Sequence, residues 1–158
     1  MPEPIVKFKD LEITYNLGKE NEFKATKGAT ADIYAGEFIA FFGPSGCGKS
    51  TIMYSILGIL EPSAGQLLVK GENPYTFSPE EMVTFQTRTI GIIYQAFFLI
   101  NSISVIDNVA LPQIFDGVSP GKRRKWAKIL LERFGIGDLG EKYPDNLSGG
   151  QCQRVAVS

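Results

Sequence analysis

Residues 43–51 of the chain read Gly-Pro-Ser-Gly-Cys-Gly-Lys-Ser-Thr and contain the pattern G-x-x-x-x-G-K-[ST]. An apolar run precedes the stretch at residues 38–42, and a helical pattern of apolar side chains follows it from Ile52 to Leu60. Glycines let such a backbone curl so that successive N–H groups point inward and hold phosphate oxygens. The following helix adds its free N-terminal amides and the positive end of its dipole. The sequence therefore predicts a phosphate-binding loop between a strand and a helix.

Two side chains of this loop have expected roles in holding a nucleotide. Lys49 would reach the β- and γ-phosphates, and the Ser50 hydroxyl would complete a Mg²⁺ shell. A chance match is the alternative, but a random chain of this length shows the pattern only about once in a hundred. The strand–loop–helix context makes chance a weaker explanation still. The expected nucleotide contacts of the loop are Gly43, Pro44, Ser45, Gly46, Cys47, Gly48, Lys49, Ser50 and Thr51.

Strand patterns lie on both sides of the loop. Residues 5–15 hold apolar side chains in near-alternation, which predicts a half-buried strand. The run 38–42 is almost wholly apolar, which is typical of a strand covered on both faces in an α/β fold. The other expected strands are the run through Phe23, Ala29 and Ile33, residues 66–70 and residues 90–94.

Helix signals dominate the second half of the chain. Ser78, Pro79 and Glu81 predict a helix start, because they supply the cap, the first helical position and the capping-box carboxylate. A further helix is expected to begin at Ser119-Pro120 and to end at Gly135. We expect three parts, which are a β subdomain plus loop core at 1–95, a helical part at 96–146, and a last motif with the start of its helix at 147–158.

Composition excludes several kinds of function. The chain has 158 residues, a formal net charge of −1 and no His. Near-neutral charge argues against a nucleic-acid binder that works by bulk charge, and the lack of His excludes His-based catalysis and His metal sites. The two cysteines form no zinc or disulfide pattern. The longest apolar stretch, residues 90–100, is too short to span a bilayer, so we expect any membrane connection to run through a partner.

Residues 147–151 read Leu-Ser-Gly-Gly-Gln and predict a second helix start. Ser148 can cap the helix and Gln151 stands at the capping-box position. A helix N-terminus on small residues can also bind an anion. By itself the motif is better explained as a merely capped helix than as an anion site.

Together, the loop at 43–51 and the motif at 147–151 resemble the ATP-binding subunit of ABC transporters. Residues 90–95 and 108–112 further resemble the lipoprotein-release and macrolide-efflux branch of that family. The resemblance implies an α/β fold, with a P-loop NTPase (RecA-like) core, an N-terminal antiparallel β subdomain and a helical subdomain. It also implies ATP and Mg²⁺ as ligands.

The resemblance implies roles for several residues. Residues 43–51 would be the Walker A loop, Tyr15 the aromatic residue that stacks on adenine, and Gln95 the contact to Mg²⁺ and water. Tyr15 could instead be a core strand residue, and Gln95 an ordinary loop residue. Phe97 to Ile100 would either dock the membrane subunit or pack in the core. The signature residues that would grip the nucleotide of the opposite protomer are Ser148, Gly149, Gly150 and Gln151.

The family also implies partners, a location and an activity. The partners would be membrane-spanning transporter subunits and a second ATP-binding subunit in a head-to-tail dimer, with no nucleic acid. The protein would lie in the cytoplasm, attached to the inner face of the plasma membrane through those subunits. In the family the Walker B strand and the catalytic Glu follow the signature, so we expect this chain to be the N-terminal part of a longer ATPase. Hydrolysis by these 158 residues alone is therefore not expected, nor is more than marginal folding.

Three other functions remain open from the sequence. A non-transport ABC-type ATPase would work without membrane subunits. A catalytically silent remnant would bind ATP without releasing phosphate. A small-molecule P-loop kinase explains residues 43–50 but leaves residues 147–151 without a role.

Overall fold

The computed structural model describes residues 2–158, which form two compact units. The first unit ends at Gly91 and the second comprises Ile92–Ser158. Each unit has its own hydrophobic core. No helix among residues 2–158 is long and apolar enough to cross a membrane.

The first unit is built on a three-stranded antiparallel sheet with β1 in the centre. The strand order is β2-β1-β3, with β1 at Val6–Tyr15, β2 at Phe23–Ile33 and β3 at Ala64–Val69. The strand predicted for residues 5–15 is therefore confirmed, although several register shifts interrupt its pairing with β2 and β3. The pairing register shifts between Phe8 and Leu11, so these two side chains are both buried although three positions separate them.

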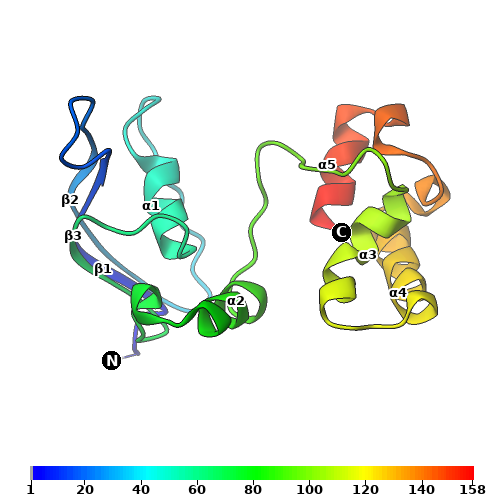
Figure 1. Cartoon of the computed structure of the whole chain (residues 1–158), viewed down its shortest axis with the longest axis horizontal. Helices are drawn as coiled ribbons and strands as arrows, with labels where there is room; N and C mark the ends of the chain where they lie inside the picture. The colour runs from blue at the N-terminus through cyan, green and yellow to red at the C-terminus, as the bar shows by residue number, and fades with distance from the viewer. Residues whose placement is uncertain (1) are drawn as a thin grey trace. The chain divides into compact units, whose positions relative to one another are not determined.

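One helix, α1 at Lys49–Ile56, packs against this sheet (Figure 1). Its residues Ile52 and Ile56 contact the cluster formed by Phe8, Leu11 and their neighbours, as the helical pattern after the loop predicts. The short turn η1 at Pro74–Thr76 secures the far end of α1. There the Tyr75 hydroxyl lies 2.8 Å from the Ser55 carbonyl oxygen and 2.6 Å from that of Leu60.

Helix α2 at Pro79–Arg88 begins as predicted. The Glu81 amide donates to Ser78 Oγ and the Ser78 amide donates to the Glu81 carboxylate, at 3.3 and 2.8 Å. The backbone and hydroxyl of Ser78 hold the pKa of the Glu81 carboxyl below its usual value. The capping box is therefore confirmed as the start of this helix.

Two predicted strands are wrong for this structure. Residues 38–42 and 90–94 form neither strand nor helix, and no backbone segment of residues 2–158 pairs with them. Phe38 and Phe42 are 95% and 92% exposed, which contradicts the prediction of a strand covered on both faces. Apolar, β-branched composition makes a segment able to form a strand, but a strand also needs a hydrogen-bonded neighbour.

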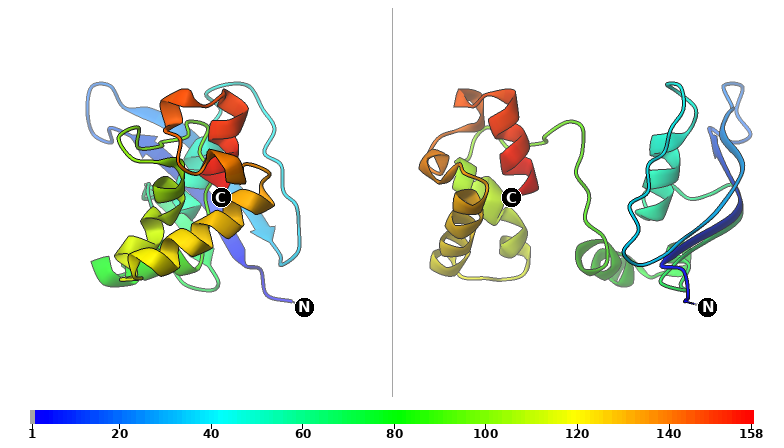
Figure 2. Two further views of the ribbon diagram at one scale, coloured as in Figure 1. Left: turned by 90° about the vertical axis from the view of Figure 1, so that its right-hand side faces the viewer. Right: turned by 180° about the vertical axis from the view of Figure 1, so that it is seen from behind.

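The second unit is helical, in agreement with the helix signals in the second half of the chain. Its helices are α3 at Val105–Phe115, α4 at Pro120–Arg133 and α5 at Gly149–Val157 (Figure 2). The turns η2 at Gly137–Leu139 and η3 at Pro144–Asn146 connect α4 to α5. The core comprises Val105, Ile106, Ala110, Ala127, Leu131, Ile136, Leu139 and Val155.

Candidate functional site

The loop at residues 43–48 owes its shape to glycines in left-handed conformations. Gly46 has φ +79° and Gly48 has φ +91°, which side-chain-bearing residues rarely adopt. The loop runs directly into α1, whose first turn contains no acidic residue and no side-chain cap. The amides of this turn therefore remain available to an anion, as the sequence predicts.

Gly48 also allows the loop to contact the sheet. A Cβ atom at this position would lie 2.5 Å from the Ala25 carbonyl oxygen and 2.9 Å from Thr26 Oγ1. Only a residue without a side chain lets the start of α1 approach β2 so closely. The approach brings the loop beside the end of the β1–β2 hairpin, and this contact assembles the site.

Lys49 folds back over its own loop. Its ammonium nitrogen Nζ donates to the Gly43 and Pro44 carbonyl oxygens, at 2.9 and 2.7 Å, and lies 3.6 Å from Cys47 Sγ. These carbonyls are neutral acceptors, and hydrogen bonds from an ammonium group to a charged oxygen are stronger. A phosphate group at the loop can therefore replace them as the partner of Lys49.

A cavity of about 260 Å³ lies between the loop and the hairpin. On one side Tyr15 lies with its hydroxyl oxygen 3.2 Å from Thr51 Oγ1, a hydrogen bond that fixes the tyrosine relative to α1. Of the residues predicted to bind the nucleotide, the structure thus brings Tyr15 together with the loop. The cavity is lined by Tyr15, Phe23, Ala25, Gly46, Gly48, Lys49, Ser50 and Thr51.

Phe23 also lines this cavity, although no sequence motif pointed to it. Phe23 is the first residue of β2 and pairs with Tyr15, the last residue of β1. It is 56% exposed, so the core does not use its ring. The signal was present in the sequence, because two strands joined by a short polar loop place the residues that flank the loop side by side. The cavity therefore carries two aromatic rings.

Ser50 fits the role of a single magnesium ligand. It is exposed, lines the same cavity, and its hydroxyl makes no hydrogen bond within residues 2–158. The described residues contain no cluster of three or more His, Cys, Asp or Glu side chains that could hold a metal by themselves. Mg²⁺ commonly takes one or two protein oxygens and completes its shell with phosphate and water, so the donor set here fits a nucleotide-bound Mg²⁺.

A larger cavity of about 420 Å³ lies elsewhere in the first unit. Glu72, Glu80 and Glu81 line it together with Phe77 and Phe85. Three carboxylates oppose the entry of a phosphate group, and two of them, Glu80 and Glu81, lie in the first turn of α2. This turn also begins with Pro79, which has no backbone N–H to offer an anion. The smaller cavity is therefore the candidate nucleotide site.

The motif at residues 147–151 forms the start of α5. The Gln151 amide donates to Ser148 Oγ and the Ser148 amide donates to Gln151 Oε1, at 3.3 and 2.8 Å. The Ser148 hydroxyl accepts a bond in this cap, so its proton remains available for a ligand. Gly149 and Gly150 are exposed, with nothing within 4 Å of where their Cβ atoms would lie. The predicted cap is confirmed, and it leaves an open helix end.

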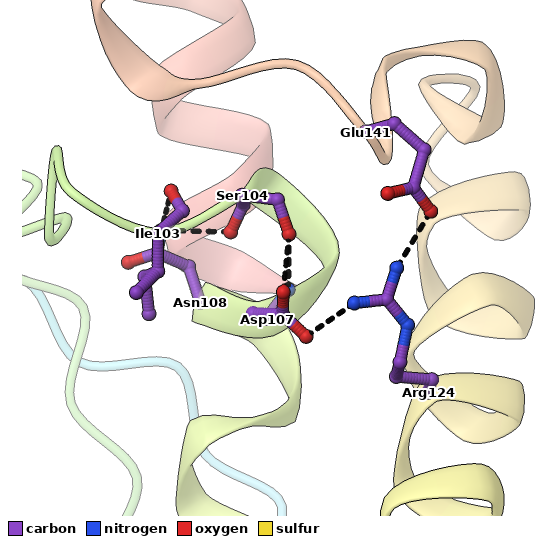
Figure 3. Close-up of polar contacts among 6 residues, drawn as sticks. All are labelled: Ile103, Ser104, Asp107, Asn108, Arg124 and Glu141. Atoms are coloured by element: carbon purple, nitrogen blue, oxygen red, sulfur yellow. Dashed lines mark hydrogen bonds and ion pairs between the residues drawn. The ribbon is translucent and has the colours of Figure 1, made fainter.

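Gln95 lies in the second unit, at the start of an irregular segment that leads to α3. The segment is held by Asn108, whose side chain accepts from the Ile100 amide at 2.8 Å and donates to the Ile100 carbonyl. The same side chain also donates to the carbonyls of Ile103 and Ser104 (Figure 3). Gln95 itself is exposed. Of the cluster that follows, Leu99 packs on the core, while Phe97, Phe98 and Ile100 remain exposed.

Comparison with known protein families matches residues 26–158 to the family described as ABC transporter. Among curated proteins, the macrolide export ATP-binding/permease protein MacB of Nitrosomonas europaea is 38% identical over 98% of this chain. The chain spans 24% of that relative. An uncharacterized ABC transporter ATP-binding protein of Thermotoga maritima is 37% identical over 98% of this chain, which spans 65% of it.

Solved structures show the same likeness. The dimeric, post-hydrolysis ATP-binding cassette MJ0796, bound to ADP and Pi, matches with a TM-score of 0.84 and 34% identity over 96% of this chain and 67% of its own. CbiO1 of Clostridium perfringens, part of the ABC transporter complex cbiONQ, matches with a TM-score of 0.79 and 31% identity, over 98% of this chain and 60% of its own. The expected fold class is confirmed by these structures.

Proposed function

The chain belongs to the ABC transporter family, and from this premise we propose that it forms the ATP-binding part of a transporter. The observation that carries the proposal is the cavity in which Tyr15 and Phe23 of the hairpin meet Lys49, Ser50 and Thr51. Two aromatic rings at one end and a cationic, amide-lined loop at the other match the two ends of a nucleotide. The sequence motif alone supplied only the phosphate end.

In this proposal the base lies against the aromatic rings. Aromatic faces stack on any base, and Tyr15 is held in place by its hydrogen bond to Thr51. Because Thr51 belongs to α1, the base position and the phosphate position are fixed relative to each other. Phe23 contributes a second apolar surface, which a bound base would cover.

The phosphates lie over the loop and the first turn of α1. The amides of residues 46–51 and the dipole of α1 bind the phosphate oxygens, and Lys49 moves from the Gly43 and Pro44 carbonyls to the charged oxygens. Mg²⁺, when bound with the nucleotide, supplies charge neutralisation of the phosphates. Ser50 offers it a hydroxyl oxygen, and Gln95 is the proposed further contact to the ion and its water.

The open start of α5 is the proposed second half of the nucleotide site. Ser148, Gly149, Gly150 and Gln151 would contact the γ-phosphate held by the loop of a second copy, in a head-to-tail dimer. Closure of that dimer would act on membrane-spanning subunits at the cytoplasmic face of the membrane. The dimeric state of the similar cassette MJ0796 and the place of the similar CbiO1 in a transporter complex support this arrangement.

We propose ATP hydrolysis as the activity that this nucleotide site serves. The residues that line the cavity include no carboxylate, so this set can hold the phosphates but offers no base to position an attacking water. The 158-residue chain is therefore expected to bind Mg-ATP and to release phosphate slowly at most. A catalytically silent nucleotide-binding remnant remains the alternative that this observation favours.

A calorimetric titration of the purified chain with Mg-ATP tests the proposal. Lys49→Ala is expected to weaken binding about 10- to 100-fold, because it removes a charge-assisted hydrogen bond to the phosphates. Lys9→Ala is the matched control, since it removes the same charge from an exposed position of β1 outside the cavity. Equal affinities of Lys49→Ala and the control would contradict the assignment of the cavity.

A further inference from the structure

Helix α4 carries apolar and basic residues on the face that it turns away from its core. We propose that this face binds the surface of an anionic lipid membrane directly. The face is defined by Lys122, Lys125, Trp126, Ile129 and Arg133 and is called the α4 stripe below. The proposal goes beyond nucleotide binding, because none of these residues lies in the unit that contains the loop.

The stripe follows from helical spacing. Relative to Lys122, its members stand at positions +3, +4, +7 and +11, which a 3.6-residue period places on one side of the helix. All five are exposed, whereas Ala127 and Leu131 on the opposite side are fully buried. The side chains of the stripe therefore share one solvent-facing surface.

Apolar residues stand in the middle of this surface. Trp126 is 53% exposed and Ile129 is 47% exposed. A merely solvated helix face would carry polar side chains at these two positions. Tryptophan among lysines and arginines is instead typical of helices that lie in the plane of a membrane interface, where the ring enters the headgroup layer.

Residues 122–125 form a basic run, Lys-Arg-Arg-Lys, and its two central arginines serve a different purpose from the α4 stripe. Arg124 binds Asp107 on α3 and Glu141 before η3, at 2.6 and 2.7 Å (Figure 3). Arg123 donates to the Val118 carbonyl oxygen at 3.3 Å. The hydroxyl of Ser104 and the guanidinium of Arg124 hold the pKa of the Asp107 carboxyl below its usual value. These inward contacts account for Arg123 and Arg124 as structural residues.

The cations of the stripe have no such contact. Within residues 2–158, no ion pair holds Lys122, Lys125 or Arg133. The one carboxylate beside them on the exposed side of α4 is Glu132, so the stripe is locally positive in a chain whose net charge is −1. Charge complementarity therefore points to an anionic partner.

A lipid surface fits this arrangement better than an acidic protein. The long stems of Lys122, Lys125 and Arg133 can keep their charges among lipid phosphates while Trp126 and Ile129 enter the apolar boundary below them. Helix α4 has 14 residues, about 21 Å of helix, so it would lie on the membrane and not cross it.

The experiment uses the fact that the chain contains a single tryptophan, which is Trp126. The purified 158-residue chain is titrated with vesicles of phosphatidylcholine containing phosphatidylglycerol, and with vesicles of phosphatidylcholine alone. The emission of Trp126 is expected to shift to shorter wavelength with the anionic vesicles only. Lipids brominated on the acyl chain are expected to quench it, because the ring lies near the apolar boundary.

Variants separate the stripe from general charge. Lys122→Gln with Lys125→Gln is expected to weaken vesicle binding about twentyfold, and Ile129→Ser about tenfold. Lys19→Gln with Lys27→Gln makes the same charge change at exposed positions of the first unit and is expected to leave binding unchanged. Circular dichroism of each variant confirms that the helices remain folded.

Three outcomes would overturn the proposal. The first is no emission shift with either kind of vesicle. The second is equal weakening by the control pair, which would mean that binding depends on general charge. The third is binding to a polyglutamate peptide without binding to vesicles, which would make the stripe a protein-docking surface.

Discussion

Gly48 shows how much of the site depends on a single residue. It combines a left-handed backbone, φ +91°, with a contact to β2 in which the Ala25 carbonyl oxygen occupies the space next to its α-carbon. The sequence pattern requires a glycine here for the turn of the loop. The structure adds the second reason, which is that the glycine lets the loop approach the hairpin that carries Tyr15 and Phe23.

Gly48→Ala is therefore expected to reduce the free energy of unfolding of the first unit by about 2–4 kcal/mol, through backbone strain and a forced shift of β2. Urea unfolding followed by circular dichroism measures the change. Gly46→Ala is the control, since Gly46 has a similar φ of +79° but open space around its Cβ position. If the two variants are equally destabilised, the contact with Ala25 contributes nothing.

At the scale of elements, ends of helices were more predictable than strands. Ser78 and Ser148 begin α2 and α5 through the expected capping boxes, because a cap involves only residues three positions apart. Strand pairing involves residues far apart in sequence, and residues 38–42 lack a partner among residues 2–158. The link from η1 to α1 through Tyr75 was also not foreseen, since it joins residues 15 and 20 positions apart.

Tyr75 gives this link a pH dependence. Burial raises the pKa of the Tyr75 hydroxyl from 10.0 to about 12, so the neutral hydroxyl is favoured in the folded state. Its contribution to stability is complete below pH 10.0 and is lost as the pH rises through about 12. Tyr75→Phe is expected to lower the free energy of unfolding by about 1 kcal/mol at neutral pH. The free energy of unfolding of this variant is expected to fall less steeply over that alkaline range than that of the wild type.

Urea unfolding of wild type and variant at a series of alkaline pH values measures this difference. Tyr143→Phe, which removes a hydroxyl from an exposed ring, is the control and is expected to keep wild-type stability at neutral pH. Parallel pH curves for wild type and Tyr75→Phe would contradict the role of the Tyr75 hydroxyl.

At the scale of the whole molecule, the chain exposes apolar surface on backbone that has no partner. Phe38 and Phe42 are almost fully exposed, and the backbone groups of residues 38–42 make no hydrogen bond within residues 2–158. Such a segment can pair with a second copy. The 158-residue chain is therefore expected to self-associate.

Phe38→Ser is expected to lower this association, with a larger monomer fraction in sedimentation velocity and little change in the unfolding midpoint. Phe115→Ser is the matched control. It removes another exposed ring, 84% against 95% for Phe38, but Phe115 lies at the end of α3, where the helix satisfies the backbone. Equal effects of the two variants would mean that exposed rings alone, and not the unpaired segment, cause association.

The phosphate loop, the helix caps, the strand at residues 5–15 and the family resemblance could all be predicted from the order of the residues. These features depend on neighbouring residues, so spacing and residue type are sufficient to specify them. The fold had to show that the paired rings of Tyr15 and Phe23 line the cavity beside the loop, that the loop approaches the Ala25 carbonyl at Gly48, and that residues 38–42 stay unpaired. It also divided the basic run of α4 into inward arginines and an outward stripe. Each of these depends on which distant segments meet, because packing and pairing join residues that the chain order separates.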